Sequence, residues 1–97
     1  MKNNESYLEK EKQIRVEVID IIERNNYLFN NLTLSEEEKN HIIGISISIL
    51  MKKRYNYPCG GFVESVVNND LYSATVKSDS INRKVLYFYA MLNNLYV

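Results

Sequence analysis

The stretch from Ser35 to Arg54 constrains the fold more than any other part of the chain, because its ends and its middle favour different structures. Ser35 followed by Glu38 fits a capping box, and the acidic run there suits the positive end of a helix dipole. Basic residues close the stretch and suit the negative end. Isoleucine alternates with small or polar residues over 43–49, which alone is typical of a strand. The stretch is too long for an ordinary strand, so we predict one helix that is buried on most sides.

Three further segments carry the periodicity of amphipathic helices. Residues 6–24 place apolar residues on one helix face. Residues 62–74 also place apolar residues on one face, with a bend expected near 68–70. Asp79 or Ser80 can cap a last helix. The expected apolar positions are Leu8, Ile14, Val18, Ile21 and Ile22, then Phe62, Val63, Val66, Val67, Leu71 and Ala74, then Ile81, Val85, Phe88, Leu92 and Leu95. The only proline and two of the three glycines mark a loop at 55–61. We predict a single all-α domain over residues 1–97, a compact bundle of four or five helices.

Length, charge and apolar content restrict the class of protein. The 97 residues suffice for one domain, and twelve basic residues balance twelve acidic ones. Proteins that bind duplex nucleic acid usually carry a basic surplus, so nucleic acid is not an expected partner. The start of the chain has no apolar stretch of the kind found in signal peptides, and no segment is apolar for the length of a membrane span. The sequence therefore predicts a cytoplasmic protein that does not associate with membranes.

Catalytic chemistry has few candidate residues. His41 is the only histidine, so it cannot belong to a multi-histidine metal site, and we expect it in a solvated or core-edge position. Cys59 is the only cysteine and would need a base to act as a nucleophile, so a structural place in the turn is the stronger interpretation. We predict a protein without catalytic residues, metal or cofactor.

The loop at 55–61 is the centre of a candidate ligand site. Basic residues beside tyrosines can hold a phosphate and stack a base, and bare amides at a helix start can accept an anion. Two plainer interpretations compete, in which the basic residues complement the helix dipole and the glycines supply positive φ in a turn. Arg83 is included in this candidate site because we expect the last helix to return to the same end of the bundle. The site is expected to bind an anionic ligand or an acidic partner surface through Lys53, Arg54, Tyr57, Gly60, Gly61 and Arg83.

Three short patterns occur in the second half of the chain. They are the Pro-x-Gly-Gly-Phe turn within residues 57–63, the Asn-Asp-Leu step at 69–71, and the Asp-x-x-Asn-Arg sequence at 79–83. Together they resemble a group of short proteins encoded by phages and prophages, over about residues 55–94. The resemblance implies phage origin and action in the host cell cytoplasm. Small helical phage proteins often counter host defences.

Two functions are therefore considered. The first is a non-catalytic counter-defence protein that binds a host immune protein or sequesters a small anionic nucleotide signal. The alternative is a small nucleic-acid-binding or structural protein-interaction module.

Self-association is a separate expectation. Eight tyrosines exceed what one small core can hide, and Val16 and Ile19 widen the apolar stripe of the first helix. A net charge of zero gives little repulsion between copies. We predict a homo-oligomer, most simply a dimer.

Overall fold

Six α-helices and one 3-10 helix account for most of residues 2–96, which the computed structural model describes; side chains are described for residues 6–96. The elements are α1 (Lys2–Arg24), η1 (Asn26–Phe29), α2 (Glu36–Tyr55), α3 (Gly61–Val67), α4 (Leu71–Lys77), α5 (Ser80–Lys84) and α6 (Leu86–Leu95). Residues 2–96 contain no strand, so the all-α prediction is confirmed. The predicted number of four or five helices is wrong, because there are six.

α2 is the centre of the domain and confirms the prediction of one long helix. The Ser35 Oγ accepts a hydrogen bond from the Glu38 N–H at 3.1 Å, and the Glu38 Oε1 accepts one from the Ser35 N–H at 2.8 Å. Asn56 ends the helix in the left-handed conformation, with φ at 58°. Because α1, α3 and α6 all pack against α2, apolar residues can occupy several of its sides. Its buried residues are Ile42, Ser46, Ile47, Ile49, Leu50 and Met51.

The helix count exceeds the prediction because two expected helices are each divided. Asn69 adopts positive φ, 58°, and Asp70 then caps α4 by accepting a hydrogen bond from the Ser73 N–H at 3.1 Å. The break separates α3 from α4 where only a bend was expected. Val85, at φ −119° and ψ 22°, likewise separates α5 from α6. Asp79 caps α5 as predicted, since its Oδ1 accepts a hydrogen bond from the Asn82 N–H at 2.7 Å.

The core forms where α6 and α1 meet α2. Phe88 and Leu92 of α6 and Val18 of α1 are fully buried, as the periodicity predicted. Tyr89 is fully buried too, and its hydroxyl donates a hydrogen bond to the Asn82 Oδ1 at 2.8 Å. This burial raises the pKa of the Tyr89 hydroxyl. Leu95, expected in the apolar stripe of the last helix, is 72% exposed, so that assignment is wrong.

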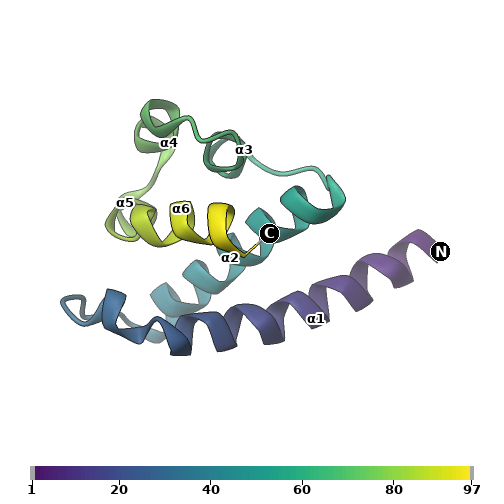
Figure 1. Cartoon of the computed structure of the whole chain (residues 1–97), viewed down its shortest axis with the longest axis horizontal. Helices are drawn as coiled ribbons and strands as arrows, with labels where there is room; N and C mark the ends of the chain where they lie inside the picture. Colours follow the sequence, from purple (N-terminus) through teal and green to yellow (C-terminus); the bar gives the residue numbers. More distant parts are fainter. Residues whose placement is uncertain (1, 97) are drawn as a thin grey trace.

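The long helices and the short helices occupy opposite sides of the molecule. Figure 1 shows α1 along one edge, α2 crossing the middle, and α3 and α4 on the far side, with the first turns of α1 projecting beyond the other helices. α3 and α4 pack against each other, and α3 also contacts α6. None of the helices within residues 2–96 combines the length and the apolar character that crossing a membrane requires.

Candidate functional site

Arg54, the central cation of the predicted ligand site, is already bound within the chain. Its guanidinium donates two hydrogen bonds to the carboxylate of Glu17 on α1, both at 2.7 Å, and one to the Tyr96 carbonyl oxygen at 2.6 Å. The Glu17 carboxylate raises the pKa of Arg54, and the guanidinium in turn lowers the pKa of Glu17. Through these three hydrogen bonds Arg54 joins α1, α2 and the end of α6, and its charge is matched by that of Glu17. The geometry favours this structural role over anion binding.

Tyr57 lies half-buried in a small aromatic cluster. Its ring meets the Tyr7 ring of α1 edge to face, with centroids 4.8 Å apart, and the Tyr55 ring with centroids 6.2 Å apart. The Lys10 Nζ sits 4.6 Å from the centroid of Tyr55 and 5.8 Å from that of Tyr57. A cation over an aromatic face and edge-to-face rings both stabilise such a cluster. Tyr57 therefore attaches the first half of α1 to the end of α2, and a base could stack on it only by displacing these neighbours.

The two glycines of the loop stand at the start of α3. Gly60 is the N-cap residue and Gly61 the first helical residue, and both are exposed. No glycine among the described residues has positive φ; Asn56 takes the left-handed conformation instead, so that part of the plain-turn interpretation is wrong. A Cβ added to Gly61 would lie 3.6 Å from the Lys77 Nζ of α4. This cation beside the loop was missed, because only the packing of α4 on α3 brings it there.

Arg83 and Lys53 do not form one site. Arg83 donates hydrogen bonds to the Oγ and the carbonyl oxygen of Ser78, both at 3.3 Å, whereas Lys53 is exposed near the end of α2. The start of α5 is held near the beginning of α2, since the His41 Nε2 lies 3.1 Å from an Asp79 carboxylate oxygen. From residue 41 to residue 54, α2 rises by about 20 Å. The expectation that the last helix brings Arg83 to Arg54 is wrong.

The residues considered for catalysis show no activated group. Cys59 is partly buried, and its burial raises the pKa of the thiol, which is the opposite of what a reactive thiolate requires. His41 is partly exposed at the edge of the domain and pairs with Asp79. Among the described side chains, no three histidine, cysteine, aspartate or glutamate residues gather where they could hold a metal ion.

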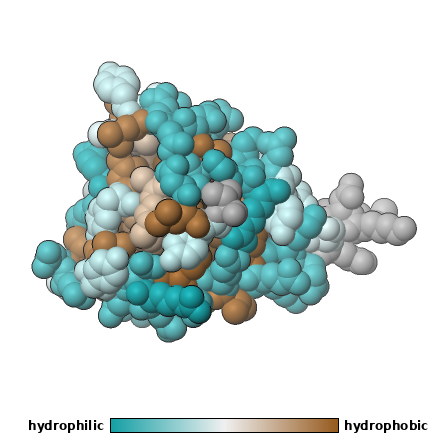
Figure 2. Space-filling view, viewed as in Figure 1, coloured by the Kyte–Doolittle hydropathy of each residue, from teal (hydrophilic) through white to brown (hydrophobic). Residues whose placement is uncertain are grey.

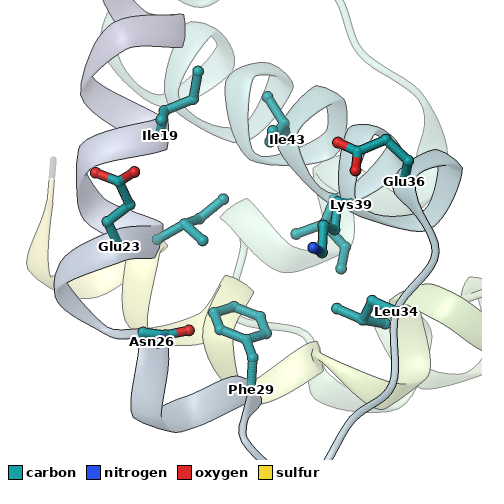
Figure 3. A pocket seen from close by; sticks show the side chains of 10 residues that line it. Ile19, Glu23, Asn26, Phe29, Leu34, Glu36, Lys39 and Ile43 are labelled. Atoms are coloured by element: carbon teal, nitrogen blue, oxygen red, sulfur yellow. The ribbon is translucent and has the colours of Figure 1, made fainter.

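A groove lies between α1 and α2 on the described surface. We call it the α1/α2 groove; its volume is about 490 Å³, within the range typical of binding pockets. Figure 3 shows Ile19 and Glu23 on one wall, Lys39 and Ile43 on the other, and Phe29 of η1 between them. The lining is Ile19, Ile22, Glu23, Asn26, Phe29, Leu34, Glu36, Lys39, Ile42 and Ile43. The groove is thus apolar in its depth, with charged groups around it.

A second apolar surface covers α4. Leu71, Tyr72 and Val76, which we call the α4 face, are 67%, 80% and 62% exposed. A hollow of about 200 Å³ lies between α4 and α6, and Leu71 lines it together with Leu86 and Ala90. In Figure 2, apolar residues reach the surface in this region of the molecule. Leu71 was expected in the core, and it faces outward because the break at residues 68–70 rotates α4 relative to α3.

Comparisons with models of protein families, with curated proteins and with solved structures find no match for this chain. The resemblance to small phage proteins therefore stays a prediction that rests on the three sequence patterns.

Proposed function

We propose that the protein is a non-catalytic module that binds another protein through the α4 face. The observation that carries this proposal is the exposure of three apolar side chains on one short helix, with Tyr72 and Val76 one turn apart and Leu71 next to the hollow between α4 and α6. Burying a side chain of this size contributes about 1.5–3 kcal/mol, and tyrosine is among the residues that dominate interfaces. Adjacent exposed apolar side chains next to a hollow are typical of an interaction surface.

The charge distribution supports a protein partner over a nucleotide. A nucleotide signal needs several free cations and a free aromatic face, whereas Arg54 is matched by Glu17 and Tyr57 packs against Tyr7. The exposed positions of α4 from Leu71 to Val76 carry uncharged side chains, and its one charged residue, Lys77, lies in the last turn beside Gly61. Such a surface suits the apolar patch of a folded partner.

The wider proposal is counter-defence in a bacterial host. The phage-like sequence patterns and a protein-binding surface together favour a host immune protein as the partner, which the module would inhibit by covering part of its surface. Sequestration of an anionic nucleotide at Lys53, Tyr57, Gly60 and Gly61 is the second candidate, and Lys77 beside Gly61 is the observation that favours it. A nucleic-acid-binding module remains the alternative that the balanced charge supports least.

Co-purification from bacterial cells tests the proposal with two matched variants. Leu71→Glu places a charge on the α4 face, at a first-turn position where an acidic residue suits the helix dipole. Leu95→Glu is the control, since Leu95 is exposed to a similar degree but lies at the end of α6. We expect a protein partner with the wild type and the control, and a loss of recovery of about tenfold or more with Leu71→Glu.

Native mass spectrometry of the same preparations provides the second readout. A co-purifying nucleotide without a protein partner would contradict the proposal and favour sequestration. Equal recovery of the partner with Leu71→Glu and with the wild type would exclude the α4 face as the binding surface.

A further inference from the structure

The outer side of α1 carries an apolar stripe that its own chain does not cover. Leu8, Val16 and Ile19 are 55%, 70% and 41% exposed, although the core face of the same helix, with Ile14 and Val18, is buried. At 3.6 residues per turn, Leu8, Val16 and Ile19 fall within about 80° of one another. The sequence predicted that Val16 and Ile19 widen the apolar stripe of this helix, and within a single chain this wider part is not covered.

Two charged residues belong to the same stripe, which we call the α1 stripe. Lys12 falls between Leu8 and Val16, and Glu23 follows Ile19, so both lie within the same sector of about 80°. The stripe is therefore basic toward the start of the helix and acidic toward its end, with apolar residues between. Such an arrangement is complementary to itself when the helix is reversed.

We propose that α1 pairs antiparallel with α1 of a second copy about a two-fold axis level with residues 17 and 18. In this register Val16 faces the partner's Ile19, and Lys12 faces the partner's Glu23. The symmetry creates each contact twice. Parallel pairing in register would instead place Lys12 against the partner's Lys12 and Glu23 against the partner's Glu23. The charges thus select the antiparallel arrangement.

The α1/α2 groove explains why the pairing continues beyond the two central contacts. Ile19 and Glu23 form its α1 wall, so the first half of the partner helix lies along its mouth. The partner's Leu8 comes level with residue 27 in η1, between the groove residues Asn26 and Phe29. The partner's Lys12 meets an edge that carries Glu23. The charge pattern and the groove therefore favour the same occupant.

The projecting turns at the start of α1 agree with this pairing. Figure 1 shows them beyond the ends of the other helices. A short helical extension of this kind is marginally stable by itself in water. The pairing does not rest on the proposed function, because the α4 face lies on the far side of the molecule.

A charge-swap series on the full chain, followed by sedimentation velocity and light scattering, tests the proposal. We expect a dimer for the wild type and for the control Leu95→Glu, and a monomer for Ile19→Glu. Lys12→Glu and Glu23→Lys each turn two attractive contacts into repulsive ones, so each should raise the dimer Kd about tenfold. The double variant, with both changes, should restore the dimer. In-register parallel pairing predicts instead that the single variants dimerise as well as the wild type, since each only exchanges one like-charge contact for another.

Circular dichroism of each variant separates loss of pairing from loss of fold, because all three positions are exposed and helicity should persist. A wild-type protein that is strictly monomeric at high micromolar concentration would overturn the proposal. So would a dimer that Ile19→Glu leaves intact, or a double variant that stays as weak as the single ones.

Discussion

Replacing Arg54 by alanine removes three hydrogen bonds that join α1, α2 and the end of α6. Hydrogen bonds to charged groups contribute about 1.5–3 kcal/mol each when buried. Here the side chains of Arg54 and Glu17 are 24% and 38% exposed, so solvent weakens the pair. We expect a total loss of about 2–3 kcal/mol in the free energy of unfolding. For a domain of this length, that loss lowers the Tm by about 10–20 °C.

Thermal and urea unfolding followed by circular dichroism measure this effect, and Lys53→Ala is the matched control. Lys53 is the preceding residue on the same helix and is exposed, so its replacement should change the free energy of unfolding by less than about 0.5 kcal/mol. Glu17→Gln should reproduce most of the loss, and the double variant should lose less than the sum of the two single variants. An Arg54→Ala protein that melts at the wild-type temperature would refute the structural role of Arg54. Arg54 would then again be a candidate for binding an anionic ligand.

Three smaller effects follow from other contacts. Since Arg54 lowers the pKa of Glu17, the pair stabilises the fold above the ordinary carboxyl pKa of 4.5 and loses its effect as the pH falls through the lowered value. The Tm difference between wild type and Glu17→Gln should therefore shrink as the pH is lowered below 4.5. Asn56→Ala should cost about 1 kcal/mol more than Asn56→Gly in urea unfolding, because φ is 58° and glycine tolerates that conformation; equal stabilities would contradict this. Cys59 should react with iodoacetamide more slowly in the folded than in the urea-unfolded protein, since burial raises the pKa of its thiol, and equal rates would count against that burial.

The helix ends could be predicted from the sequence because they depend on local hydrogen bonds. Ser35 and Asp79 each accept a bond from an amide three residues ahead, and that spacing is visible in the sequence. The breaks at Asn69 and Val85 could not be placed from the apolar pattern, which continues across them. As a result, Leu71 was assigned to the core although it faces outward.

The candidate site depended on contacts between distant residues, and there sequence reasoning was less successful. Gly60 and Gly61 do stand at a helix start, which is a local property. The match between Arg54 and Glu17 joins positions 37 residues apart, and nothing in the sequence pairs this arginine with that glutamate among several acidic residues. The distance between Arg83 and Arg54 likewise depends on where α5 meets α2, which the periodicity of either helix does not indicate.

The way α4 is anchored has a consequence for its motion. Of its seven residues, all of which the structure describes, Ala74 alone is buried. A helix this short has little stability of its own, and the hydrogen bond at its Asp70 cap is exposed to water. Opening α4 therefore costs much less free energy than unfolding the domain, as is common for segments that contact ligands. Amide hydrogens of α4 should exchange with solvent well before those of α2, and an occupied α4 face should slow that exchange, so a partner would rigidify the helix that it binds.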